Sequence, residues 1–144
     1  VAPAVHGRVD ADVDVGQHRL RQHQAEGHLV ALVSGTFAPF LELIARWMDV
    51  PHAIGTPLAV RNGRYTGRIV PPLCQSEGKP RRVLAYLAQQ SLEVDWTASY
   101  AYADRNTDLP MLGLVGHPVA VYPDEALLAY ARQRGWPVIG EGNP

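Results

Sequence analysis

Hydrophobic and polar positions along the chain follow the rhythm of alternating strands and helices. Leu29–Val33 is a continuous apolar run bounded by Gly27 and by Ser34-Gly35, which is typical of a strand buried on both faces of a parallel sheet. Two shorter apolar segments, Ser99–Ala103 and Val119–Tyr122, have the same character. These three runs predict strands at the centre of the fold.

Helical patterns lie between these runs. Gln17–Glu26 is polar and compatible with a helix, and apolar residues recur at helical spacing within Ala38–Asp49. Proline is favoured in the first turn of a helix, so Pro80 predicts that another helix begins there. Asp124–Arg134 begins with acidic residues and ends before Gly135, as helices commonly do. Alternating strands and helices predict an α/β fold, a three-layer Rossmann-like arrangement with a mostly parallel sheet.

One segment interrupts this alternation. Pro57–Arg61 and Arg64–Val70 flank Asn62-Gly63. This dipeptide is a strong signal for a two-residue hairpin turn, because both residues accept a positive φ. We therefore expect a small β-hairpin insertion, after which Pro71-Pro72 leads back into the α/β pattern.

Length and composition narrow the possible classes of protein. The 144 residues suit a single domain, and 47% hydrophobic with 19% charged residues argues against disorder, collagen and coiled coil. Thirteen Lys and Arg against fourteen Asp and Glu give a net charge of −1, so no charge-driven binding to nucleic acid or to a membrane is expected. The single Cys74 fits a reducing cytosol, and the apolar runs are too short to span a bilayer. No signal peptide is visible, and we expect a cytoplasmic protein of unspecified oligomeric state.

Three polar clusters occupy places where open α/β sheets bind ligands. Ser34-Gly35-Thr36 offers a hydroxyl, a flexible glycine and helix N–H groups to a phosphate, although the same residues also suit a helix N-cap and tight turn. Lys79 begins a predicted helix, where the dipole disfavours a cation unless an anion neutralises it. Asp104 and Asp108 offer the hard oxygen ligands that suit Mg²⁺, or else an N-cap and a first-turn acid.

In their order and spacing, these clusters resemble motifs two, three and four of the haloacid dehalogenase superfamily, in its phosphoserine-phosphatase-like branch. The segments HQAEGHLVALVSGT, NGRYTGRIVPPLCQSEGK and YADRNTDLPML carry the resemblance. The segment VGHPVAVYPDEALLAYARQRGWPVI resembles the closing strand-helix-strand, so the resemblance runs from about His23 to Ile139. It implies a core domain at residues 17–144, preceded by an irregular segment at residues 1–16.

The resemblance implies an Mg²⁺-dependent hydrolase of a small phosphorylated metabolite, in which an aspartate attacks phosphorus. Ser34 would bind the phosphoryl oxygens with help from the Gly35 N–H. Lys79 would be catalytic and would neutralise charge shared by the phosphoryl group and the nucleophile. Asp104 would ligate Mg²⁺ directly, and Asp108 would ligate it directly or hold its water shell. These residue roles suit phosphoryl transfer, because that reaction depends mostly on positioning the phosphoryl group and on stabilising its charge.

The first motif of that family departs most from this sequence. It is a hydrophobic strand that ends in Asp-x-Asp-x-Thr or Val and supplies the nucleophile, and the 33 residues before Ser34 contain neither this strand nor space for a helical cap. We therefore expect an N-terminally truncated or altered chain with little phosphatase activity of its own. Val9–Gly16 alternates apolar and acidic residues, so Asp12 and Asp14 either replace the motif on a half-exposed strand or lie in a solvated segment. Arg105 also departs, because a long cation beside Asp104 would either compete with Mg²⁺ for that carboxylate or bind phosphate itself.

Other interpretations stay open. A non-catalytic phosphate- or metabolite-binding module, or the partner of a complete enzyme, needs Ser34 and Lys79 but no nucleophile. A fragment without a central strand would leave a slot in the sheet and invite strand exchange between copies. Three histidines, His18, His23 and His28, recur every five residues, which scatters them around a helix, so we expect surface imidazoles and no second metal site.

Overall fold

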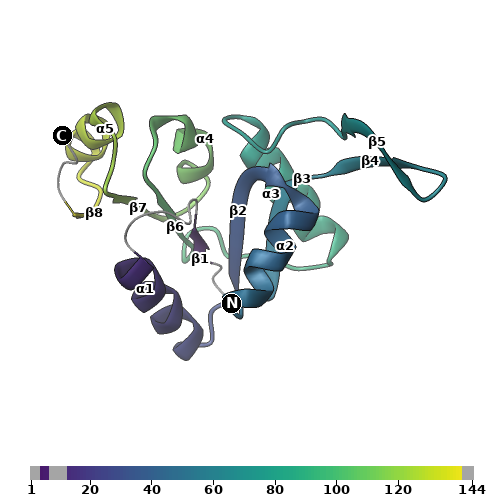
Figure 1. Ribbon diagram of the computed structural model, residues 1–144. Helices are drawn as coiled ribbons and strands as arrows, with labels where there is room; N and C mark the ends of the chain where they lie inside the picture. The colour runs from purple at the N-terminus through teal and green to yellow at the C-terminus, as the bar shows by residue number, and fades with distance from the viewer. Residues whose placement is uncertain (1–3, 7–12, 141–144) are drawn as a thin grey trace.

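The computed structural model describes residues 4–6 and 13–140, with side chains from residue 16 onward. Strands and helices alternate along most of this length (Figure 1). The elements in chain order are β1 (Ala4–His6), α1 (Val13–Ala25), β2 (Val30–Phe37), α2 (Ala38–Trp47), β3 (His52–Thr56), β4 (Leu58–Arg61), β5 (Arg64–Ile69), α3 (Gly78–Gln89), β6 (Tyr100–Ala103), the short 3₁₀ helix η1 (Asn106–Asp108), α4 (Leu109–Leu112), β7 (His117–Val121), α5 (Glu125–Arg134) and β8 (Val138–Ile139).

Six strands form one sheet in the order β3-β2-β1-β6-β7-β8, and every neighbouring pair is parallel. All strands therefore end at the same edge, which we call the carboxyl edge, and begin at the amino edge. In β2 the residues Val30–Val33 are all buried, as the continuous apolar run predicts for a strand covered on both faces. The predicted parallel α/β architecture is confirmed.

The N-terminal residues differ from the expected irregular segment. Residues 4–6 form β1 between β2 and β6, with His6 opposite Leu32 and Tyr102, so the sheet slot expected to be open is filled. Three residues are too few to show a strand pattern in the sequence. The helix α1 begins at Val13, and Asp14 therefore lies in a helical turn rather than on the considered strand. Asp12 lies outside the described residues.

Alternate residues of each central strand face two separate hydrophobic cores. On one face, Ala31, Val33, Ala101 and Ala120 pack with residues of α3, α4 and α5, including Val83, Leu87, Met111, Leu112 and Leu127. On the other face, Val30, Leu32, Tyr102 and Val119 pack with Leu20 of α1 and with Leu41 and Ala45 of α2. Helices thus cover both faces of the sheet and give the three predicted layers.

The predicted hairpin is confirmed, and Figure 1 shows it projecting from the body of the molecule. The strands β4 and β5 are antiparallel, with Arg61 opposite Arg64. Asn62 and Gly63 between them have φ values of 52° and 74°. Both values lie in the left-handed region, which the turn requires and this dipeptide accepts at little cost.

The helix α5 begins and ends at the residues that the sequence predicts. The Asp124 side chain caps the helix by accepting a hydrogen bond from the Leu127 N–H, and Gly135 ends it in the left-handed conformation. The strand β3 was also not predicted, because its sequence HAIGT shows neither alternation nor a continuous apolar run. Across the part of the chain that the structure describes, no helix has the length and hydrophobicity needed to cross a membrane.

Candidate active site

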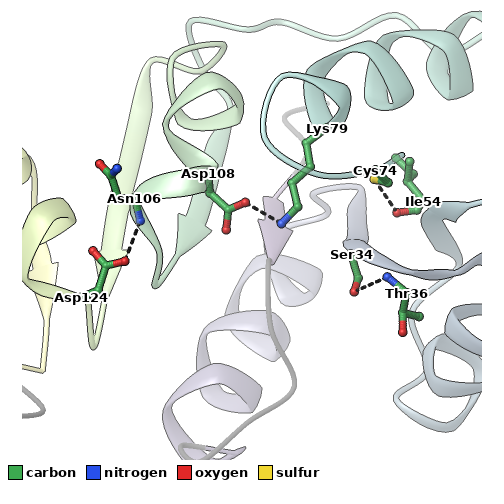
Figure 2. A network of polar contacts seen from close by, with 8 residues as sticks. All are labelled: Ser34, Thr36, Ile54, Cys74, Lys79, Asn106, Asp108 and Asp124. Atoms are coloured by element: carbon green, nitrogen blue, oxygen red, sulfur yellow. Dashed lines mark hydrogen bonds and ion pairs between the residues drawn. The ribbon is translucent and has the colours of Figure 1, made fainter. Parts of the chain in front are cut away.

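The Ser34-Gly35-Thr36 segment lies at the carboxyl end of β2. These residues continue the strand to Phe37, and Phe37 is the residue that precedes α2, without a side-chain capping hydrogen bond. The alternative that Ser34 is the N-cap of the helix is therefore wrong. The Ser34 hydroxyl oxygen instead accepts a hydrogen bond from the Thr36 N–H at 3.2 Å, within the end of the strand (Figure 2).

A buried threonine fixes the backbone around this segment. The Thr56 hydroxyl donates to the Gly35 carbonyl at 3.0 Å and accepts from the Cys74 N–H at 3.0 Å. Beside it, a Cβ on Gly55 would lie 2.7 Å from the Thr36 carbonyl oxygen, so only glycine fits. The ends of β2 and β3 and the loop before α3 are thus locked together, and sequence analysis did not identify Thr56.

Lys79 is the only lysine in the sequence, and it lies in the first turn of α3. A Cβ on the preceding Gly78 would lie 1.9 Å from the Leu73 carbonyl oxygen, so the helix can begin this close to the loop only with glycine there. The Lys79 ammonium nitrogen lies 2.6 Å from Oδ1 of Asp108, and the two side chains are only 7% and 5% exposed. A cation in the first turn of a helix is disfavoured by the helix dipole unless an anion lies next to it. For Lys79 that anion is the Asp108 carboxylate.

This buried ion pair says more about function than about stability. Removing two charges from water is expensive, and their mutual attraction usually does little more than offset that expense. A well-packed apolar pair would serve the fold as well. A buried ammonium–carboxylate pair at the ligand-binding edge of an α/β sheet therefore favours a role in binding charge.

The segment between β6 and η1 carries the two predicted metal ligands. Asp104 directly follows β6 and is half-buried, whereas Asp108 ends η1 and is buried. Their carboxylates are the hard oxygen donors that suit Mg²⁺. Lys79 contacts Oδ1 of Asp108. Arg105, expected to compete for Asp104, has an exposed side chain.

Asp124 braces this segment from the neighbouring strand end. Its N–H donates to the Asp104 carbonyl at 2.8 Å, and its Oδ2 accepts from the Asn106 N–H at 2.9 Å. Its Oδ1 accepts from the Leu127 N–H at 2.8 Å. The sequence predicted only that Asp124 opens α5, because nothing local shows that a helix cap also holds a loop 18 residues earlier.

The structure brings some of the predicted residues into contact and others to a shared edge. Lys79 and Asp108 are in direct contact, and Figure 2 shows Ser34 at the end of β2 across from this pair. Asp104 directly follows β6, which is separated from β2 by β1 alone. Cys74 lies nearby with its thiol donating to the Ile54 carbonyl at 3.5 Å, and burial raises its pKa to about 11. Cys74 is thus a buried packing residue whose thiol stays protonated.

Comparison with known proteins places this arrangement in a family. The model of the haloacid dehalogenase-like hydrolases matches residues 12–113, a range that includes Ser34, Lys79, Asp104 and Asp108. The chain belongs to this family.

Two relatives of the chain are named as phosphatases. The chain is 34% identical to a histidinol-phosphatase from Neisseria meningitidis, over 83% of this chain and 55% of that protein. It is 35% identical to a phosphoserine phosphatase from Mycobacterium tuberculosis, over 85% of this chain and 40% of that protein. A solved structure from Bordetella pertussis, described as a protein with unknown function, is 39% identical with a TM-score of 0.79, and the match covers 86% of this chain and 56% of that one. The chain is phosphoserine-phosphatase-like, and it spans about half the length of the curated relatives it matches.

Proposed function

We propose that the carboxyl edge of the sheet binds the phosphoryl group and the metal ion of an Mg²⁺-dependent phosphomonoester hydrolase. The observation that carries this proposal is the buried Lys79–Asp108 pair, which lies inside the segment matched to the hydrolase family. An ammonium group held in a protein interior next to a carboxylate is suited to share its charge with an incoming phosphate.

Each residue at this edge has a distinct part in the proposal. The Ser34 hydroxyl and the Gly35 N–H bind phosphoryl oxygens at the end of β2. Lys79 balances the charge of the phosphoryl group, and Asp108 holds the ammonium in place. Asp104 and Asp108 hold Mg²⁺, which supplies further positive charge to the equatorial oxygens. Asp124 does not contact the ligand but positions the Asp104 segment through its two backbone contacts.

The proposed substrates are small phosphate monoesters. Phosphoserine and histidinol phosphate are the two to test first, because the relatives named above are a phosphoserine phosphatase and a histidinol-phosphatase. Nothing at the edge formed by Ser34, Lys79 and Asp108 distinguishes the two leaving groups, since all three residues are assigned to the phosphoryl group or its metal.

We further propose that this 144-residue chain, tested alone, binds phosphate better than it hydrolyses esters. Its sequence contains no apolar run followed by Asp-x-Asp-x-Thr or Val. Of the two carboxylates considered as a replacement, Asp14 belongs to α1. Ordered phosphoryl ligands without a positioned nucleophile support binding and only weak turnover.

The test separates binding from turnover. Calorimetry with inorganic phosphate and Mg²⁺ measures binding, and release of phosphate from p-nitrophenyl phosphate, phosphoserine and histidinol phosphate measures activity with Mg²⁺ or with EDTA. Ser34→Ala removes one proposed phosphate ligand at a half-buried position, and Arg81→Gln is the matched control because it removes an exposed cation in the first turns of α3. We expect Ser34→Ala to weaken phosphate binding about tenfold, the value of one hydrogen bond to an anion, and the control to leave it unchanged.

The outcomes decide separately whether the phosphate site exists and whether the chain alone is impaired in turnover. Phosphate affinity that is equal in Ser34→Ala and in the unmodified chain refutes the site. Rapid Mg²⁺-dependent turnover by the chain alone refutes the impairment but supports the site, and its loss in Asp12→Asn would assign the nucleophile to that segment. Phosphate binding without turnover in any ester supports both parts.

A further inference from the structure

Three potential metal ligands lie together at the amino edge of the sheet, away from the proposed phosphate site. They are His23 and Glu26 at the end of α1 and His28 just before β2, and one ligand atom of each lies within 4.8 Å of the other two. Nδ1 of His23 is 2.8 Å from Nδ1 of His28, and Nε2 of His28 is 3.7 Å from a Glu26 carboxylate oxygen. His23 is buried, His28 is half-buried and Glu26 is exposed, so the cluster opens from the interior to solvent.

The end of α1 brings these side chains together. Gly27 has a φ of 79°, its N–H donates to the Gln24 carbonyl, and the His28 N–H donates to the His23 carbonyl, both at 3.0 Å. These are the two hydrogen bonds of a Schellman motif, in which the residue after the glycine folds back against the last helical turn. In an uninterrupted helix, residues five apart point about 140° away from each other. The prediction of scattered surface imidazoles overlooked this turn, and it is wrong for His23.

His23 is also held in a fixed orientation. Its Nε2 lies 2.6 Å from the Tyr102 hydroxyl, and its ring packs 4.8 Å from the ring of Tyr100. Its other nitrogen, Nδ1, is therefore directed at His28. Histidines that bind metals usually have their second nitrogen hydrogen-bonded in this way, which fixes the ring and its tautomer. Burial, and then the neighbouring His28, lower the pKa of His23 and favour the neutral imidazole.

We propose that His23, Glu26 and His28 form a binding site for a zinc-class divalent ion. The ligands are Nδ1 of each histidine and one Glu26 oxygen, with solvent in the fourth position, and the exposed Glu26 side chain has to swing from the Nε2 side of the His28 ring to its Nδ1 side. Zinc takes this combination of imidazole and carboxylate, whereas Mg²⁺ prefers oxygen ligands alone. Two nitrogens bound to one tetrahedral zinc lie about 3.3 Å apart, so the His28 ring has to move by about half an ångström from its present 2.8 Å and to turn until both nitrogens face the ion. The ion would fasten the end of α1 to the start of β2.

A chain of hydrogen bonds without a metal is the competing explanation. Tyr102 can donate to His23, His23 to His28, and His28 can point its remaining N–H toward Glu26, with both rings neutral. The two explanations differ in one measurable property. A hydrogen-bonded chain has no reason to bind zinc tightly, whereas a three-ligand site does.

The experiment is zinc binding by the untagged, metal-free chain at neutral pH. Competition with a chromophoric chelator gives the affinity and stoichiometry, and thermal unfolding with and without zinc gives the stabilisation. His28→Gln removes a half-buried ligand without emptying the core, and His18→Gln is the matched control, because His18 is an exposed histidine on α1. We expect one zinc per chain, at least tenfold weaker binding in His28→Gln, and unchanged binding in His18→Gln.

Imidazole nitrogen shifts in NMR spectra give a readout that does not depend on stability. Zinc should shift Nδ1 of His23 and His28 and leave His18 unchanged, and a tenfold excess of Mg²⁺ should not reverse the shifts. Equal zinc affinity in His28→Gln and His18→Gln, or no binding at micromolar zinc, would overturn the proposal in favour of the hydrogen-bonded chain. Neither result bears on phosphate binding, which is measured with Mg²⁺ at the opposite edge.

Discussion

The two edges of the sheet hold polar clusters that are assembled in opposite ways. At the carboxyl edge, Lys79 and Asp108 come from α3 and η1 and meet only because the whole fold brings those elements together. At the amino edge, His23 and His28 come from a single helix end and the turn that follows it. The first cluster depends on tertiary packing, and the second depends largely on one glycine.

This difference predicts how each cluster responds to change. The carboxyl-edge pair is buried, so removal of either partner leaves an isolated charge in the interior. The amino-edge cluster opens to solvent through Glu26, so its side chains can rearrange or hydrate when one is lost. Substitutions at the first edge should therefore affect stability most, and substitutions at the second should affect local structure and ligand binding.

The largest effect is expected from breaking the ion pair on one side only. Lys79→Met leaves the Asp108 carboxylate buried without its counter-ion, and removal of one member of such a pair typically lowers the free energy of unfolding by about 3–5 kcal/mol. Urea unfolding followed by circular dichroism measures this loss. The same substitution at exposed Arg81 should change the value by less than about 0.5 kcal/mol.

The double variant sharpens the comparison. Lys79→Met with Asp108→Leu replaces the pair by apolar side chains of similar size, so no charge stays buried alone. We expect it to recover most of the stability that the single variant loses while binding no phosphate. A double variant as unstable as Lys79→Met would show that the pair itself contributes substantially to the fold, contrary to the functional interpretation.

At the amino edge, the corresponding test is the glycine that makes the turn. Gly27→Ala adds a Cβ that meets no atom within 4 Å, so its effect comes only from the φ of 79°. A non-glycine residue in that region costs about 1–2 kcal/mol. Gly113→Ala, at a right-handed helix end with ordinary space, is the control. Gly27→Ala should also weaken zinc binding, and unchanged zinc affinity would contradict the role of the turn.

The contrast between the edges also explains what could be predicted from the sequence. The carboxyl edge was accessible because a parallel sheet brings every strand end to one side, so polar residues after Val33 and Ala103 had to share an edge. The order of the three motifs then indicated the family. The pairing of Lys79 with Asp108 was not predicted, because no pattern in the sequence states which anion a buried lysine meets.

The amino edge was missed for a different reason. Helical spacing predicts that His23 and His28 point apart, but this holds only if the helix continues past Gly27, which is a helix stop signal in the sequence. A histidine on each side of a helix-ending glycine is the pattern that would have found the cluster. Strand β1 was missed because its three residues gain their strand conformation from pairing with β2 and β6 rather than from their own sequence.

A smaller effect is expected at the brace of the carboxyl edge. Asp124→Ala removes the cap of α5 and the acceptor of the Asn106 N–H together, and loss of a cap alone costs about 1 kcal/mol. Asp124→Asn keeps one side-chain oxygen and should lose less. Glu125→Gln, at the adjacent exposed position, is the control. If phosphate affinity falls in Asp124→Ala but stays normal in Glu125→Gln, the brace matters for the site, and equal affinities would limit Asp124 to a helix cap.

The smallest expected effect is the pH dependence of stability that comes from His52, the first residue of β3 at the amino edge. Nδ1 of His52 lies 2.7 Å from the Tyr86 hydroxyl on α3, and burial lowers its pKa below the usual 6.5, while burial and then Glu42 raise the pKa of Tyr86. Below pH 6.5 the unfolded chain therefore binds a proton that the folded chain does not, so stability falls as the pH drops from 6.5 through the lower folded pKa. In His52→Gln this part of the pH dependence should vanish, and in His18→Gln it should persist, when unfolding is measured in EDTA between pH 5 and pH 8. Identical pH profiles for the two variants would show that the His52 imidazole is protonated as readily in the folded chain as in the unfolded one.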